Sequence, residues 1–133
     1  MSKKTKIILF QTVPLLIGIL IYALFRHQPP FERYLPWDNP VFDIGFLPRF
    51  LRDFILYNLS DALWAFAFVS ALDMCIKKPL KSAAIVMIAV IVFEYCQLIG
   101  IIKGTGDVGD IFFSMCAVVI YTIFLGGRNE KMV

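Results

Sequence analysis

The chain has 133 residues, of which 59% are hydrophobic and only 17% are charged. A soluble domain keeps about a quarter of its residues charged to cover its surface. This composition and a mean hydropathy of +0.77 therefore exclude a water-soluble globular domain and predict a membrane protein. The formal net charge of +3 is too small to suggest a nucleic-acid partner.

Four apolar segments are long enough to cross a hydrocarbon core about 30 Å thick, at a rise of about 1.5 Å per residue. They cover residues 7–25, 54–76, 82–102 and 108–125. The connections after the second and third segments are short, so both form tight hairpins. The sequence predicts an all-α membrane protein, a single transmembrane domain over residues 1–133 that folds as a compact four-helix bundle.

The basic N-terminus followed by an apolar run is also the pattern of a secretory signal peptide. The run contains Pro14, is long for such a peptide and lacks a clear small-x-small cleavage site, which favours a retained first span.

Lysine and arginine residues predict the orientation, because positively charged flanks stay in the cytoplasm. With the N-terminus inside, eight of them are cytoplasmic, namely Lys3, Lys4, Lys6, Lys77, Lys78, Lys81, Arg128 and Lys131. The five outside are Arg26, Arg33, Arg49, Arg52 and Lys103. We therefore expect a multi-pass protein with both termini in the cytoplasm.

The only long connection, the outer loop 26–53, contains five of the seven prolines together with interleaved aromatic residues such as Trp37. This composition excludes a continuous helix and predicts a segment at the headgroup level of the membrane. Its last part, 47–54, predicts a short interfacial helix that begins near Pro48. Arg49 and Arg52 then either lie beside the hydrocarbon as part of a connector or meet lipid phosphates as part of a lid.

Four carboxylates fall on the predicted spans, although each costs about 2.5 to 3.5 kcal/mol even on the lenient insertion scale. Asp61 and Glu94 share a level, roughly 10 to 12 Å below the outer ends of their spans. Asp110 opens the fourth span, whereas Asp73 is near the cytoplasmic end with Lys77 four residues later, the spacing of a helix-face ion pair.

The sequence thus predicts a polar pocket open to the outside. Asp61, Glu94 and Asp110 form its walls, with polar and aromatic residues around them, namely Asn58, Gln97, Thr105, Asp107, Tyr57, Trp64 and Tyr95. Carboxylates this close cannot all be ionised, so a cation, a ligand ammonium or hydroxyl group, or a bound proton relieves their repulsion. Alternatively, the acids form interhelical hydrogen bonds that only fix the bundle.

No metal, cofactor or catalytic residue is predicted. The three cysteines are on different spans without C-x-x-C spacing, the acids do not form a recognised metal loop, and the single His27 has no nucleophile and acid around it. Acid–base catalysis by two carboxylates stays open.

The pattern of Glu94 and Gln97 three residues apart, followed by Gly104-Thr-Gly-Asp107-Val-Gly-Asp110, resembles the VanZ-like family of small membrane proteins. The resemblance covers about half of the chain, and the chain departs from the family at Ser114, where Asn is usual. It implies a bacterial integral membrane protein of the cell envelope in which Glu94, Gln97, Asp107 and Asp110 are the family's polar positions. The family's named member is associated with reduced susceptibility to teicoplanin.

Three functions compete. The first is binding or modulation of an outer-leaflet envelope lipid or amphiphile, such as a lipid-linked cell-wall precursor. The second is a non-catalytic subunit or scaffold for a partner membrane protein, with Ala67 and Ala71 as a small-residue contact. The third is a small proton-coupled carrier. A homo-oligomer and a lipid-headgroup enzyme stay open.

Overall fold

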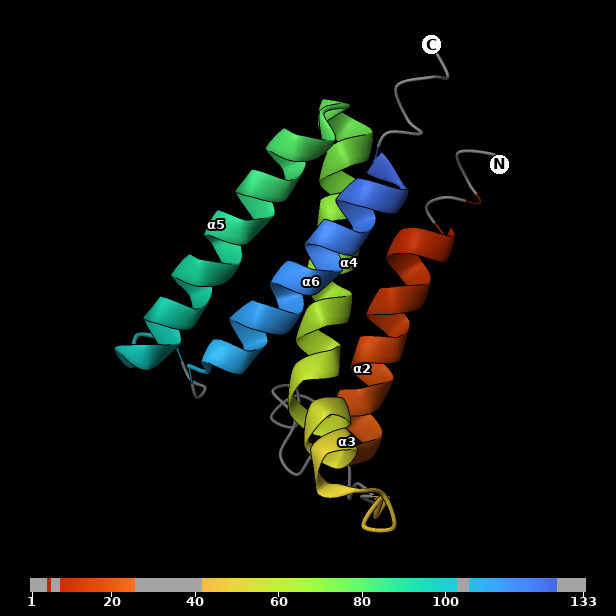
Figure 1. Ribbon diagram of the computed structural model, residues 1–133, viewed down its shortest axis with the longest axis vertical. Coiled ribbons are helices and arrows are strands. Elements are labelled where there is room, and N and C mark those ends of the chain that lie inside the picture. The colour runs from red at the N-terminus through yellow and green to blue at the C-terminus, as the bar shows by residue number, and fades with distance from the viewer. Residues whose placement is uncertain (1–4, 6–7, 26–41, 103–105, 127–133) are drawn as a thin grey trace.

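The computed structural model describes residue 5 and residues 8–25, 42–102 and 106–126. Regular structure in these ranges is helical throughout (Figure 1). The chain forms two single π-helical turns and five α-helices, which are η1 (Ile8–Thr12), α2 (Val13–Phe25), α3 (Arg49–Asp53), η2 (Phe54–Asn58), α4 (Leu59–Ile76), α5 (Pro79–Leu98) and α6 (Val108–Phe124). The predicted all-α fold class is confirmed.

Three continuous helices are long and apolar enough to cross a membrane: Ile8–Phe25, Arg49–Ile76 and Pro79–Leu98. Val108–Phe124 is a shorter apolar helix of 17 residues. These helices are compatible with a membrane helical bundle, whereas the count of four spans stays a prediction.

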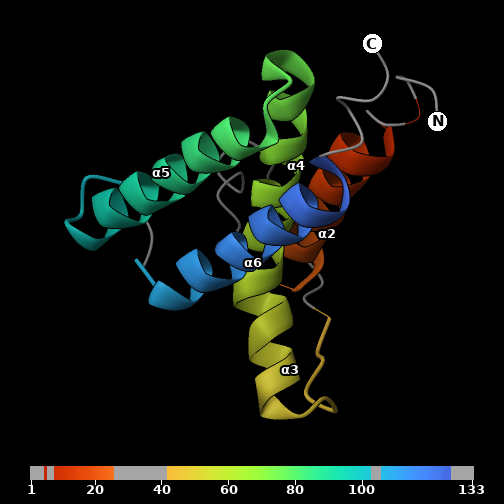
Figure 2. The ribbon, with the colours of Figure 1, turned by 45° about the horizontal axis from the view of Figure 1, so that its top comes forward.

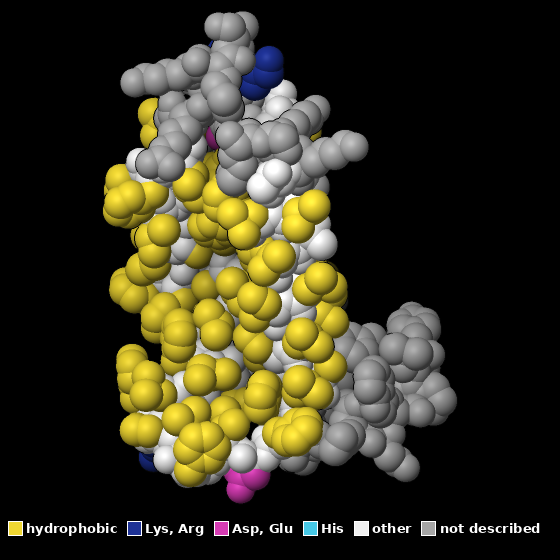
Figure 3. All heavy atoms as spheres, turned by 90° about the vertical axis from the view of Figure 1, so that its right-hand side faces the viewer, with side chains coloured by type: hydrophobic (Ala, Val, Ile, Leu, Met, Phe, Trp, Pro, Cys, Tyr) yellow, Lys and Arg dark blue, Asp and Glu magenta, His cyan; other side chains and the backbone are white. Residues whose placement is uncertain are grey.

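Burial follows the pattern of a membrane bundle and reverses that of a soluble protein. The completely or almost completely buried side chains include four serines and one acid, namely Ser60, Ser70, Asp73, Ser82 and Ser114. Large apolar side chains such as Leu16, Ile88 and Phe112 are exposed instead. One face carries an apolar band with charged side chains at its ends (Figure 3). Small residues let helix backbones approach, and lipid solvates the apolar surface.

The expected short helix begins as predicted, with Pro48 at its N-cap, but it is not a separate element. Helices α3, η2 and α4 form one continuous helix from Arg49 to Ile76. No glycine or proline interrupts this stretch, and Asp53 and Phe54 keep right-handed helical angles. The second helix therefore begins five residues earlier than the predicted span.

Glycine, proline and one lysine set the other helix ends. Helix α5 begins at Pro79, a favourable first position because proline needs no N–H partner there. It ends at Leu98, four residues before the predicted end, because Gly100 adopts a positive φ of 77°. Helix α4 ends at Ile76, and the next residue, Lys77, has a φ of 55°. In the first helix, η1 precedes Pro14, whose missing N–H interrupts the hydrogen-bond ladder.

Helix α4 is the centre of the arrangement. Figures 1 and 2 show that α2 lies alongside α4 and that α6 crosses α4. Helix α5 is close to α4 at the 77–78 turn, and the two helices separate away from this turn. The first helix begins and α6 ends at the same end of the molecule as this turn.

The core residues recur about every four positions on three helices. They are Ala65, Val69 and Asp73 on α4, Ser82, Val86 and the partly buried Val90 on α5, and Ser114, Val118 and Tyr121 on α6. Four residues advance a helix by about 400°, so such a stripe turns by about 40° per step. Helices that pack along these stripes cross one another, which explains why α5 and α6 diverge from the axis of α4.

Several predictions concern residues outside the described ranges. They are the outer-loop segment 26–41 with Trp37, His27, Lys103, Thr105, and the basic residues Lys3, Lys4, Lys6, Arg26, Arg33, Arg128 and Lys131.

Candidate functional site

The three predicted wall residues continue the core stripes at the end away from the 77–78 turn. Asp61 is four residues before Ala65, Glu94 is four after Val90, and Asp110 is four before Ser114. We call Asp61, Glu94 and Asp110 the acidic layer. Glu94 is the most buried of them, with 8% of its surface exposed.

Glu94 joins the end of α5 to the start of α6. Its Oε2 accepts a hydrogen bond of 3.1 Å from the backbone N–H of Asp107. Asp107 is the N-cap of α6, and its Oδ1 accepts from the N–H of Gly109 at 2.9 Å. Gly106 allows this close contact, because a Cβ there would lie 2.8 Å from the carbonyl oxygen of Glu94.

Asn58, the last residue of η2, approaches the same helix start. A Cβ on Gly109 would lie 3.0 Å from Asn58 Oδ1, and the rings of Phe54 and Phe113 are 4.8 Å apart one turn away. Asp110 follows in the first turn of α6, where a carboxylate interacts favourably with the helix dipole. Asn58 Oδ1 is buried and has no hydrogen-bond partner in the part of the chain that the structure describes.

Asp61 contacts α2. The hydroxyl of Tyr22 donates to Asp61 Oδ1 at 3.3 Å. Asp61 and Asp73 are three four-residue steps apart on α4, and each step turns the side-chain direction by about 40°. Asp61 therefore points about 120° away from the direction of Asp73, which explains why it contacts α2 and not α6. Glu94 instead bonds the segment that leads into α6. Asp61 thus contacts α2 and Glu94 contacts the segment before α6, and a pocket shared by the two acids stays a prediction.

Two other predicted site residues, Gln97 and Trp64, make contacts of a structural kind. Gln97 is partly buried on the last turn of α5, and its backbone carbonyl oxygen accepts from the backbone N–H of Gly100 at 3.0 Å. The Trp64 indole covers Gly18 of α2, where an added Cβ would lie 2.9 Å from Nε1. Trp64 thus contributes to the contact between α2 and α4.

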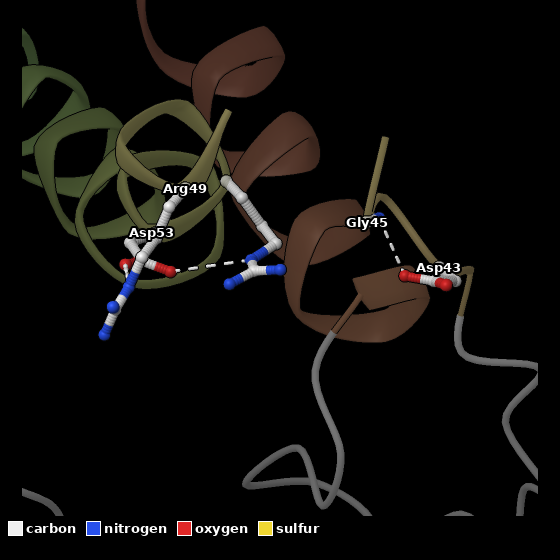
Figure 4. A network of polar contacts seen from close by, with 5 residues as sticks. Asp43, Gly45, Arg49 and Asp53 are labelled. Atoms are coloured by element: carbon white, nitrogen blue, oxygen red, sulfur yellow. Dashed lines mark hydrogen bonds and ion pairs between the residues drawn. The ribbon is translucent and has the colours of Figure 1, made fainter. Parts of the chain in front are cut away.

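Arg49 and Arg52 both pair with Asp53 at the start of the long helix (Figure 4). The Nε atoms lie 3.7 Å and 3.6 Å from the two Asp53 oxygens. The side chain of Arg49 is 88% exposed. These pairs are exposed enough that each contributes only about 0 to 1 kcal/mol.

The predicted ion pair between Asp73 and Lys77 is wrong. Asp73 is completely buried, and its Oδ2 accepts a hydrogen bond of 3.0 Å from the hydroxyl of Tyr121 on α6. Lys77 is exposed and has a left-handed backbone conformation, so its side chain does not continue the helical arrangement, although its backbone N–H still donates to the Asp73 backbone oxygen at 2.8 Å. Ser82, at the matching position across the turn, is also completely buried. We call Asp73, Ser82 and Tyr121 the tyrosine layer.

Two tyrosine partners of the acids were not predicted from the sequence. Tyr22 and Tyr121 look like ordinary aromatic residues of apolar helices. The stripe of every fourth residue, from Asp110 through Ser114 and Val118 to residue 121 or 122, is the signal that could have identified Tyr121.

Asp61, Glu94, Asp107 and Asp110 provide carboxylate oxygens at one end of an apolar bundle, and Asp73 lies at the other end. No group of three or more His, Cys, Asp or Glu residues in the described ranges could hold a metal ion. No protein-family model, curated protein or solved structure matches this chain.

Proposed function

We propose that the chain is a multi-pass protein of a bacterial cytoplasmic membrane that binds the headgroup of an outer-leaflet lipid or amphiphile at its acidic layer. In this proposal all four apolar helices cross the membrane, and the termini and the 77–78 turn are cytoplasmic. Lys77, Lys78 and Lys81 around that turn support the orientation.

The buried amide oxygen of Asn58 is the main support for binding. It has no hydrogen-bond partner in the described ranges, and an unsatisfied buried acceptor costs about 1 to 3 kcal/mol. A donor group on a ligand removes this cost. Asp107 and Asp110, beside Asn58, are acceptors when ionised, so the chemistry favours a headgroup rich in N–H or O–H groups, such as an ammonium or a sugar.

The resemblance to the VanZ-like family adds a second line of support. Its polar positions, Glu94, Gln97, Asp107 and Asp110, fall on the end of α5 and the start of α6. A lipid-linked cell-wall precursor has suitable headgroup donors, and the resemblance extends the proposal to a role like glycopeptide resistance.

Native mass spectrometry of the full chain released from nanodiscs made with bacterial lipid extract tests this proposal. Glu94→Gln removes a charge but keeps a side-chain oxygen that can accept the Asp107 N–H bond. Asp43→Asn removes an exposed carboxylate outside the site and is the matched control. Wild type and Asp43→Asn should retain a discrete lipid-sized mass that Glu94→Gln loses. Equal retention by all three proteins, or bare wild-type protein, contradicts binding at this site.

A non-catalytic membrane subunit is the second candidate, because the protein itself already supplies hydrogen-bond donors to its acids. Asp61, Glu94 and Asp73 accept from Tyr22, the Asp107 backbone and Tyr121, respectively. This candidate predicts bare protein in every sample and lower stability for Glu94→Gln. It also predicts a second chain that copurifies with the wild type.

A further inference from the structure

The start of the long helix forms a second surface, separate from the acidic layer. It combines Arg49, Arg52 and Asp53 with Phe46 and Phe50, which are 82% and 73% exposed. We call these five residues the arginine turn. Exposed aromatic rings beside arginines are typical of the level where hydrocarbon meets lipid headgroups.

Helix length places this surface at that level. The helix Arg49–Ile76 has 28 residues and is about 42 Å long, which exceeds a hydrocarbon core of about 30 Å by about 12 Å. With Ile76 at the inner boundary, the excess lies at the Arg49 end. The arginine turn then lies among the headgroups rather than in the hydrocarbon.

Charge indicates which headgroups it contacts. Both guanidinium groups share the single carboxylate of Asp53, which leaves one net positive charge among these three residues. The nearby carboxylate of Asp43 accepts the N–H of Gly45 at 2.7 Å and lies apart from Asp53 (Figure 4). Arginine presents planar donors that match phosphate oxygens, and weak exposed pairs leave those donors available.

We propose that the arginine turn binds the phosphate of an anionic phospholipid. This lipid is distinct from the ligand of the acidic layer. Arg52 is about 13 Å farther out along the helix than Asp61. In a phospholipid the phosphate is nearer the hydrocarbon than the amine or hydroxyl group is. In this protein the proposed phosphate contact, Arg52, is farther from the hydrocarbon than Asp61, the proposed contact of an amine or hydroxyl group. One such lipid therefore does not occupy both surfaces, and this proposal rests only on the membrane insertion of the long helix.

A local probe of lipid contact tests the proposal. The full chain with Phe46→Cys, and with its three native cysteines replaced by alanine, carries a bimane label at the exposed position 46. Vesicles contain phosphatidylcholine with a minor fraction of phosphatidylglycerol, and either lipid carries an acyl-chain nitroxide that quenches the label on contact. The ratio of quenching by the two lipids gives the local preference for the anionic lipid.

We expect a clear preference for phosphatidylglycerol in the starting protein. The double variant R49Q/R52Q should lower it about 30-fold, and Asp53→Asn should raise it about fivefold, since each charge at the membrane surface changes affinity about fivefold. Misfolding could lower the lipid preference of a variant, but it would not lower the preference in R49Q/R52Q and raise it in Asp53→Asn. K77Q/K78Q, at the other end of the helix, and Glu94→Gln should leave the preference unchanged.

Equal quenching by the two lipids, after each value is divided by the mole fraction of that lipid, overturns the proposal. So does an equal loss of preference in K77Q/K78Q and R49Q/R52Q, or a failure of Asp53→Asn to raise the preference. The proposed ligand of the acidic layer is tested separately, because Glu94→Gln changes the retained mass without changing the lipid preference at position 46.

Discussion

Replacing Tyr121 by phenylalanine removes one hydroxyl from the completely buried contact with Asp73. An unsatisfied buried acceptor costs about 1 to 3 kcal/mol in soluble proteins. Interhelical hydrogen bonds measured within membranes average about 0.6 kcal/mol and reach about 1.7 kcal/mol. The acceptor is an acid, the bond is 3.0 Å long and Asp73 is 0% exposed, so Tyr121→Phe should fall at the upper end of the membrane range. We expect a loss of about 1 to 1.7 kcal/mol.

Reversible unfolding in mixed micelles, titrated with dodecyl sulfate, measures this loss. Tyr95→Phe is the matched control, because Tyr95 is 59% exposed on an apolar helix, and its cost should stay below about 0.5 kcal/mol. A double-mutant cycle with Asp73→Asn isolates the pair. Equal stability of the two tyrosine variants, or zero coupling in the cycle, refutes the assignment of Tyr121 as the partner of Asp73.

Three further substitutions test other contacts by the same unfolding assay. Gly106→Ala should destabilise the protein by about 1 to 3 kcal/mol, because the new Cβ would lie 2.8 Å from the Glu94 carbonyl oxygen; wild-type stability would contradict that packing. Lys77→Gly should be neutral or stabilising by up to about 1 kcal/mol, since glycine accepts the left-handed φ of 55°. A clear loss of stability would instead show that Lys77 forms an ion pair with Asp73. Tyr22→Phe should cost less than Tyr121→Phe, because its bond to Asp61 is 3.3 Å long and only partly buried; the reverse order would contradict this ranking.

The helices were largely predictable because long apolar runs and helix-ending residues are visible in the sequence. Residues 108–125 differ from the observed α6 by one residue, and the first helix is described as far as Phe25. The main error was at the start of the second span. Of the predicted outer loop before Pro48, the structure describes residues 42–47, which form no helix, whereas residues 49–53 belong to the long helix because nothing interrupts it.

The end of the bundle at which the acids lie was predictable, but their partners were not. Counting residues along a helix gives depth directly, so Asp61 and Glu94 were correctly placed toward the same end. The direction in which each side chain points depends on helix crossing, which turned Asp61 toward Tyr22. The pairing of Asp73 with Lys77 failed because Lys77 leaves the helix, a local backbone change that i,i+4 spacing does not reveal.

The central claim is that the acidic layer is accessible from the outer side of the membrane, and the most direct test measures from which side it can be labelled. A single cysteine at Gln97, in the chain without native cysteines, can be labelled with an impermeant maleimide in right-side-out spheroplasts and in inverted vesicles. We predict fast labelling from the outside, slow labelling from the cytoplasmic side, and slower outside labelling when bacterial lipid extract is added. Labelling only from the cytoplasmic side would contradict both the orientation and an outer-leaflet ligand.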